Sequence, residues 1–323
     1  MTAARPVLLA DIGGTNARFA LLAADGIRPL PTVPTAAHPT LESALAAALA
    51  GYQGPSPRDA LLAAAGPIEG RRMRLTNANW EIDARDIRRQ FGFASVRLVN
   101  DFAAVAWSMP ALRGDDLRTL GGGDRDPDTP IVVVGPGTGL GAAAWLPGPP
   151  PGVVAGEGGH ASLAAADAGE AAVIEILRRR FGHVSAERAV SGPGLANLHA
   201  ALAERDGVRV EALAPQAITE AALAGRCPVA RAALAMFCAM LGGVAGNLAL
   251  TFRAGGGVRI AGGIAPRILD FLVASDLRER FVAKGRFRPW LETVPLAIVR
   301  HPAAALVGLA HLAGEEADLA DRQ

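Results

Sequence analysis

The sequence predicts an α/β fold, because short apolar runs typical of buried strands alternate with longer helical patterns along the chain. Three of these runs lead directly into a glycine turn, at residues 12–14, 134–141 and 260–263. Half of the 323 residues are apolar, so the chain can form one large domain or two ordinary ones.

The expected elements follow from local boundary residues. Apolar runs between Gly, Asp and Pro predict strands, and a glycine after a helical pattern predicts the end of the helix. In the first part we expect strands at Val7–Ile12, Ala17–Ala23, Leu30–Val33, Ala60–Ala65 and Val96–Val99, and helices at Leu41–Ala50 and Asp83–Phe91. After a polar loop at 121–128 we expect strands at Ile131–Val134, Ala142–Leu146 and Val258–Ala261, and helices at Gly169–Phe181, Pro193–Glu204, Val229–Leu250 and Ala303–Leu312.

The charge and the cysteines argue against several classes of protein. With 32 basic and 31 acidic residues, the net charge of +1 argues against binding to nucleic acid or to a membrane surface. The two cysteines, Cys227 and Cys238, form no Cys-x-x-Cys pair, which argues against a zinc or redox site.

An uncharged stretch between Arg231 and Arg253 is long enough to span a bilayer, and Gly242 and Gly246 have the spacing of a membrane helix-packing motif. Its alanine and glycine content and its polar residues favour a buried helix of a soluble core. The apolar run before Asp11 is too short for a signal peptide. We therefore expect a soluble, cytoplasmic protein.

The segment Asp11-Ile12-Gly13-Gly14-Thr15 has two interpretations that the residues alone leave balanced. Glycines without Cβ atoms leave successive backbone N–H groups accessible, and such a turn binds phosphate. Asp11 could then hold a cation that neutralises the phosphate. The alternative is a plain β-hairpin turn beside an incidental aspartate.

A second glycine cluster, residues 135–141, also follows a strand. It fits a relaxed dinucleotide-binding fingerprint, but Pro147 and the prolines after it stop the helix that such a fingerprint must open. A second phosphate turn is favoured over a plain hairpin. A P-loop is absent from the sequence, and Lys284 lies in no such setting. Phosphates would therefore be held by backbone N–H groups, by the hydroxyls of Thr15 and Thr138, and by a metal at Asp11.

Three acids and one histidine are the remaining candidates for chemistry. Asp101 follows a strand, so it could act as general base at a strand end, although a helix cap is the preferred interpretation when the residue is seen alone. Glu157 and His160 lie in a glycine-rich loop that could present them to a polar ligand or simply be solvated. Glu187 is by itself an ordinary surface acid.

Taken together, these segments resemble the bacterial glucokinase family, within the sugar-kinase and actin-like ATPase superfamily. The matching segments run in family order: Asp11–Arg18, Leu98–Ala104, Gly135–Gly141, Gly156–His160, Ser185–Arg188, Ser191–Gly194, Gly246–Leu250 and Ala261–Gly263. Pro136 departs from the pattern, in which a small residue is expected. It would stiffen the turn without removing the N–H groups at 137–139.

The resemblance implies transfer of the ATP γ-phosphoryl group to the 6-hydroxyl of glucose, with Asp101 as general base. The residues implied to bind the sugar are Asn100, Asp101, Glu157, His160 and Glu187. Those implied to bind ATP are Ala10, Asp11, Ile12, Gly13, Gly14, Thr15, Asn16, Gly137, Thr138, Gly139, Gly262 and Gly263. Asp11 would also organise Mg²⁺, directly or through water.

The resemblance further implies a two-domain, ribonuclease H-like fold with the active-site cleft between a small α/β domain (1–110 and 301–323) and a large one (111–300). Homodimers and a place in glycolysis are typical of the family. The alternatives are a kinase for another hexose or an amino sugar, and a sugar-binding regulatory protein on the same scaffold. The phosphoryl donor is open as well, because ATP, ADP and polyphosphate users share related scaffolds.

Overall fold

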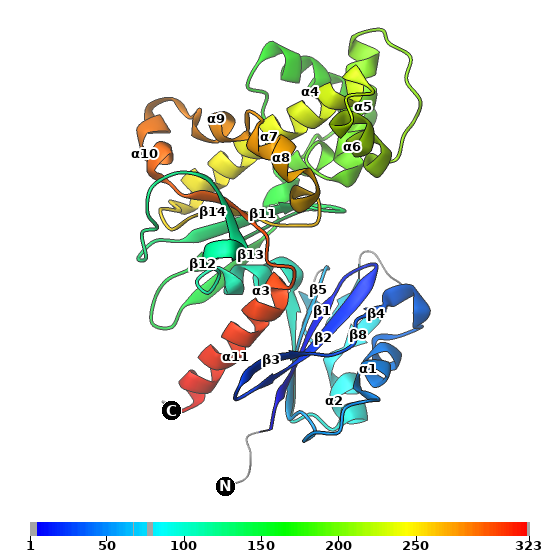
Figure 1. Ribbon diagram of the computed structural model, residues 1–323, viewed down its shortest axis with the longest axis vertical. Coiled ribbons are helices and arrows are strands. Elements are labelled where there is room, and N and C mark those ends of the chain that lie inside the picture. Colours follow the sequence, from blue (N-terminus) through cyan, green and yellow to red (C-terminus); the bar gives the residue numbers. More distant parts are fainter. Residues whose placement is uncertain (1–4, 67, 76–79, 322–323) are drawn as a thin grey trace. The chain divides into compact units, whose positions relative to one another are not determined.

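The computed structural model describes residues 5–66, 68–75 and 80–321, with side chains to residue 317. The chain divides into two compact units. Unit 1 comprises Met1–Leu112 and Pro302–Gln323, and unit 2 comprises Arg113–His301. Both units combine sheets with helices, so the predicted α/β class is confirmed (Figure 1).

The main sheet of unit 1 has the strand order β3-β2-β1-β5-β9. Strand β1 pairs antiparallel with β2 and parallel with β5, and β5 pairs parallel with β9. These strands are β1 (Val7–Ile12), β2 (Asn16–Ala23), β3 (Gly26–Pro29), β5 (Asp59–Ala64) and β9 (Ser95–Asn100), with β4 (Val33–Pro34) beside β2. Leu8, Ala10 and Ile12 point to one face of β1, as alternate residues of a strand do, and lie in one apolar core.

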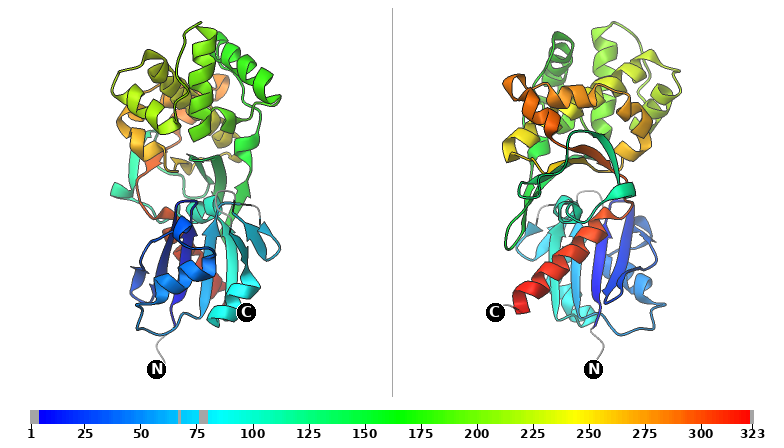
Figure 2. Two further views of the ribbon diagram at one scale, coloured as in Figure 1. Left: turned by 90° about the vertical axis from the view of Figure 1, so that its right-hand side faces the viewer. Right: turned by 60° about the vertical axis from the view of Figure 1, so that its left-hand side comes forward.

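Helices in unit 1 begin and end at local signals. Asp83 caps α2 (Ala84–Phe91), and Gly92 ends it with a left-handed φ of 68°. Thr40 caps α1 (Leu41–Leu49). The C-terminal helix α11 (Ala304–Asp321) packs against α3 (Asp101–Ser108), and Figure 2 shows it lying along the sheet of unit 1. A small sheet of β6 (Ile68–Glu69), β7 (Arg72–Arg74) and β8 (Glu81–Asp83) completes the described part of the unit.

The strand expected at Leu30–Val33 is wrong. The β2–β3 hairpin turns at Ala24 and Asp25, and Gly26, whose φ is 117°, already pairs with Ala23, so pairing begins earlier and ends at Pro29. Pro29 and Pro31 carry no N–H and cannot donate to a sheet ladder, which breaks the run before Val33.

The sheet of unit 2 has the order β10-β15-β14-β11-β12-β13. Strand β11 pairs antiparallel with β12 and parallel with β14, which in turn pairs parallel with β15. The strands are β10 (Leu117–Gly121), β11 (Ile131–Pro136), β12 (Leu140–Leu146), β13 (Gly152–Gly156), β14 (Gly257–Ile260) and β15 (Leu296–Val299). Strands β10, β13 and β15 are missing from the expected set.

The helices of unit 2 surround a buried core that contains β11 and β14. They are α4 (Ala168–Phe181), α5 (Gly192–Arg205), α6 (Pro215–Leu223), α7 (Pro228–Phe252), α8 (Leu269–Val273), α9 (Leu277–Val282) and α10 (Arg288–Thr293). Short 3₁₀ turns lie between them, among them η3 (Gly158–His160), η4 (Ala186–Arg188) and η5 (Ala265–Ile268). Helices α4, α5 and α7 agree with expectation, whereas α6, α8, α9 and α10 are not among the expected elements.

Helix α7 contains the long uncharged stretch, and it alone among the described helices is long and apolar enough to cross a membrane. Of its most apolar window, 67% is buried inside the structure. A Cβ at Gly242 would overlap the carbonyl oxygen of Leu277, and one at Gly246 would overlap that of Phe281. The glycine spacing therefore allows close packing of α7 against α9 in the core of unit 2.

Candidate active site

The first glycine turn joins β1 to β2 in unit 1. The N–H of Gly13 donates to the carbonyl of Asn16 at 2.9 Å, and the hydroxyl of Thr35 donates to the carbonyl of Gly13 at 2.9 Å. Gly14 and Thr15 are exposed, and their N–H groups have no partner among the described residues. The segment is thus a hairpin turn and at the same time offers two adjacent N–H groups to an anion.

Asp11 lies on β1 directly opposite Arg18 on β2, and the Nη1 of Arg18 donates to its Oδ2 at 3.0 Å. The Asp11 side chain is 17% exposed. Burial raises the pKa of this carboxyl above its ordinary value, and the Arg18 guanidinium opposes the rise. The second carboxylate oxygen, Oδ1, has no partner among the described residues. Asp11 can therefore give one oxygen to a cation.

Asn100 and Asp101 lie where β9 ends and α3 begins. The Oδ1 of Asn100 accepts from the N–H of Ala103 at 3.1 Å, so Asn100 is the cap and the helix begins at Asp101. Interpreting Asp101 as the cap is therefore wrong. Its Oδ1 accepts instead from the N–H of the next residue, Phe102, at 2.9 Å.

The parallel register brings these features to one edge of the unit 1 sheet. Ile12 pairs with Ala64 across β1 and β5, and Ala64 pairs with Asn100 across β5 and β9. The glycine turn and Asp101 therefore follow the carboxyl ends of strands that are two strand spacings apart, about 10 Å. This edge is where ligands bind to open α/β sheets.

The second glycine turn, Gly137–Gly139, joins β11 to β12 in unit 2. The N–H of Gly137 donates to the carbonyl of Gly139 at 2.8 Å, so it is not available to a phosphate, contrary to expectation. The N–H groups of Thr138 and Gly139 have no partner in the described part of the chain. The carbonyl of Gly137 accepts at 2.8 Å from Gly192, at the start of α5. Both turns thus leave two adjacent N–H groups accessible.

A cavity of about 780 Å³ lies beside this second turn. Gly137 and Thr138 line one side of it, Gly263 and Arg267 line another, and residues of α5 and α6 complete it. Gly262 has a φ of 85°, and a Cβ there would lie 2.5 Å from the carbonyl oxygen of Pro136, so only glycine fits. The third glycine turn therefore lies against the second. The sequence did not predict a role for Arg267, because arginine is common throughout this chain.

Glu157, His160 and Glu187 lie on neighbouring turns of unit 2. Glu157 precedes η3, and its side chain lies 3.8 Å from that of His160, both largely exposed. Turn η4 carries Glu187, and η4 is joined to the residue after η3 by a hydrogen bond from the N–H of Ala186 to the carbonyl of Ala161. The sequence pattern alone did not show that these three residues share one surface.

Glu187 is not an ordinary surface acid. It is half-buried, and its Oε2 accepts from the N–H of Leu140 at 2.8 Å, immediately after the second glycine turn. A Cβ at Gly139 would lie 2.5 Å from the same oxygen, so a side chain there would displace the Glu187 carboxylate from this contact. A Cβ at Gly159 in η3 would overlap the Leu140 carbonyl. The backbone at Leu140 thus positions both η3 and η4.

Metal ligands are sparse in the described residues, where no group of three or more His, Cys, Asp or Glu side chains could hold an ion. Mg²⁺ characteristically takes one or two carboxylates and completes its shell with water and substrate phosphate. A single accessible carboxylate oxygen at Asp11, beside an anion-binding turn, fits that donor set. Cys238 is buried, which raises the pKa of its thiol to about 12, and Cys227 caps α7.

Two sheets of this topology, each with a glycine turn at its first hairpin, agree with the class of sugar kinases with the actin-like fold. The chain belongs to the glucokinase family, whose model, "Glucokinase", matches residues 8–316. A glucokinase of Paramagnetospirillum magneticum is 45% identical over 95% of this chain and 97% of its own length.

Solved structures agree with this assignment. The crystal structure of a glucokinase from an Antarctic psychrotroph is 38% identical, with a TM-score of 0.88 over 96% of this chain and 98% of that one. A ROK-family glucokinase of Streptomyces griseus, solved with glucose and AMPPNP, is 24% identical with a TM-score of 0.63 over 95% and 98% of the chains, which shows a shared fold.

Proposed function

We propose that this chain is an ATP-dependent glucokinase, which transfers the γ-phosphoryl group of ATP to the 6-hydroxyl of glucose to give glucose 6-phosphate and ADP. Membership of the glucokinase family supports the reaction. The observation that carries it is the edge of the unit 1 sheet, where a carboxylate at a strand end shares one edge with an anion-binding turn and a second carboxylate. The product would enter glycolysis.

The nucleotide roles follow from the two turns. Gly14 and Thr15 in unit 1, and Thr138 and Gly139 in unit 2, offer backbone N–H groups to phosphate oxygens. The cavity lined by Gly137, Thr138 and Gly263 is large enough for the nucleoside. Asp11 would hold Mg²⁺, which neutralises phosphate charge that accumulates during transfer.

Asp101 accepts the proton of the attacking 6-hydroxyl. Phosphoryl transfer depends on positioning and charge neutralisation, and general base catalysis contributes ~10²–10⁴-fold. Because Asn100 rather than Asp101 caps α3, the Asp101 carboxylate is not required as the helix cap. It accepts from the Phe102 N–H, which steadies its orientation.

The sugar is recognised by side chains that can still donate or accept a hydrogen bond to a hydroxyl after their contacts within the protein are made. The Oδ1 of Asn100 is occupied by the α3 cap, so its amide N–H groups remain to donate. The Oε2 of Glu187 is occupied by Leu140, so Oε1 remains to accept. Glu157 and His160 add an acceptor and a donor. A site of this kind strongly rejects analogues that lack a hydroxyl, because its own polar groups would be left unpaired.

A coupled assay with purified protein tests the proposal. Glucose with ATP should give glucose 6-phosphate, and replacing ATP by ADP or polyphosphate should abolish turnover. Faster turnover of another hexose or of an amino sugar would show that this sugar, and not glucose, is the preferred substrate. Sugar binding without turnover with any donor would indicate a regulatory protein.

Assembly and location are proposals that rest on the family resemblance. We expect a homodimer, which light scattering of the eluted protein measures directly. We also expect a cytoplasmic enzyme, which cell fractionation checks.

A further inference from the structure

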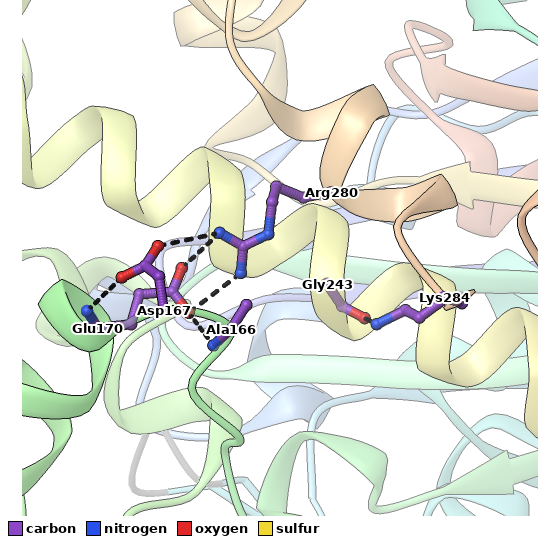
Figure 3. Close-up of polar contacts among 6 residues, drawn as sticks. All are labelled: Ala166, Asp167, Glu170, Gly243, Arg280 and Lys284. Carbon is purple, nitrogen blue, oxygen red and sulfur yellow. Dashed lines mark hydrogen bonds and ion pairs between the residues drawn. The ribbon is translucent and has the colours of Figure 1, made fainter.

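One ion pair of unit 2 joins α4 to the α9 helix, beside a cavity that Gly158 of the Glu157–His160 turn also lines. Glu170, in the first turn of α4, has a side chain that is only 3% exposed. Its two oxygens receive the two terminal nitrogens of Arg280, at 2.8 Å to Oε1 and 3.0 Å to Oε2 (Figure 3). Such a two-pronged arginine–carboxylate contact fixes orientation as well as distance.

Glu170 also holds the chain that leads from the sugar turn. Its Oε2 accepts from the N–H of Ala166 at 2.8 Å, and Asp167 caps α4 by accepting from the N–H of Glu170. Arg280 approaches Asp167 as well, at 3.8 Å. Residues 161–167, which directly follow His160, are therefore tied at their end to one guanidinium.

Apolar packing holds this segment at Leu163 alone, which contacts the core of unit 2. Residues 161–167 line a cavity of about 720 Å³, and all of them except half-buried Leu163 are exposed. Arg280 and Lys284 line the same cavity. The backbone of the segment is held near its start, where Leu163 donates to the carbonyl of Val184 and Ala161 accepts from Ala186, and at its far end by the hydrogen bond from Ala166 to Glu170.

Arg280 lies on a helix that packs against the core of unit 2. It lies on α9, which packs closely against Gly242 and Gly246 of α7. Just beyond α9, the Nζ of Lys284 donates to the carbonyl of Gly243 at 2.9 Å and to the Oδ1 of Asn247 at 2.7 Å. Helix α9 is thus fixed by its packing against the core helix α7. Arg280 on α9 binds Glu170, and Glu170 in turn accepts from Ala166.

We propose that the Arg280–Glu170 pair is a positioning device that sets the sugar-binding turn Glu157–His160 for glucose, an inference that rests on the proposed function. Arg280 does not touch the substrate. It acts through Glu170 and residues 161–167, and its effect is specific to the sugar, because the nucleotide turns are held by other contacts.

The test compares Arg280→Lys with the natural protein. Lysine keeps the charge but cannot form the two-pronged contact, so the KM for glucose should rise about 10-fold while the KM for ATP stays within about twofold. The glucose affinity measured by calorimetry without nucleotide should fall by the same factor. Equal rises in both KM values, or no change in either, would overturn the inference.

Two further variants separate positioning from folding. Glu170→Met with Arg280→Met removes both buried charges, which leaves stability unchanged or higher but removes the tie to Ala166. It should melt normally and still bind glucose weakly, and normal glucose affinity in this double variant would refute the positioning role. Arg288→Lys, in an exposed ion pair with Glu279, is the matched control and should behave as the natural protein. If the natural protein itself fails to phosphorylate glucose, the proposed function fails, whatever the variants do.

Discussion

The two units of this chain repeat one sheet. The order β3-β2-β1-β5-β9 in unit 1 corresponds to β13-β12-β11-β14-β15 in unit 2, with the same parallel and antiparallel pairings at each of the central steps. In both, the first hairpin carries a glycine turn. In both, the next parallel strand is followed by a glycine with positive φ, at Gly66 and Gly262.

The residues placed on this common frame differ. The second pair of residues from the turn differs between the two hairpins. It is Asp11 with Arg18 in unit 1 and Gly135 with Gly141 in unit 2. Strand β9 ends at Asn100 followed by Asp101, whereas β15 is followed by Arg300 and His301. The same backbone therefore leaves two adjacent N–H groups accessible in each turn. Only the unit 1 copy has carboxylates at these positions, the ones that we propose for cation binding and proton transfer.

The largest expected effect comes from removing the acid that only unit 1 has at its strand end. Asp101→Asn should lower kcat by ~10²–10⁴-fold, because the base is lost while the side-chain shape is kept. Steady-state kinetics and a thermal melt measure the two quantities. Asp86→Asn, on the surface of α2, is the control. A near-normal kcat in Asp101→Asn would remove this acid from the mechanism.

The next effect concerns Asp11, the carboxylate beside the unit 1 turn. Asp11→Asn should raise the Mg²⁺ concentration needed for half-maximal activity by about 10–100-fold, the range seen when metal-site partners are removed. A Mg²⁺ titration at fixed ATP measures it. An unchanged requirement would show that the cation is held elsewhere.

The pH dependence of Asp11 has a definite sign. Burial raises its pKa above the ordinary 3.8, so the native state binds this proton more tightly than the unfolded chain does. Its contribution to the free energy of unfolding is therefore greatest below 3.8 and declines as the pH rises through the raised pKa. Urea unfolding of the natural protein and of Asp11→Asn across this range isolates this contribution, because the other acids titrate in both. The free energy of unfolding of the natural protein relative to that of Asp11→Asn should decline as the pH rises.

Substitutions at two equivalent glycines separate the effect on stability, which both units should share, from the effect on ATP binding, which only unit 2 should show. Gly66→Ala and Gly262→Ala each force a side chain into positive φ and against a carbonyl oxygen, so each should cost about 1–3 kcal/mol of stability. Only Gly262→Ala should also raise the KM for ATP, because only this turn adjoins the cavity beside Gly137 and Thr138. Equal ATP KM values in the two variants would contradict the nucleotide assignment.

The smallest effect concerns the cap at the end of β9. Asn100→Ala and Thr40→Ala should each destabilise the protein by about 1 kcal/mol, the usual value of a helix cap. Asn100→Ala should in addition weaken glucose binding. If the two variants bind glucose equally well, Asn100 is only a structural cap.

Local signals explain what could be predicted of the fold. The helix at Asp83–Gly92 and the two hairpins were recognisable because caps, turns and apolar runs act over a few residues. Strand β10 was missed, because it pairs with β15 nearly the length of unit 2 away and none of its five residues is fully buried. Strand β13, with Ala and Gly among its five residues, has no pattern of its own and forms only against β12.

The sequence by itself determined the fold class, the two glycine turns and the order of the motifs, because these depend on residue type and short spacing. Tertiary structure decided which groups remain available for chemistry. Only the folded chain shows that Asn100 rather than Asp101 caps α3, that Gly137 spends its N–H within its own turn, and that Glu187 holds the backbone at Leu140. Hydrogen bonds between residues distant in the chain are absent from local patterns, since they exist only once the strands and turns have been brought together.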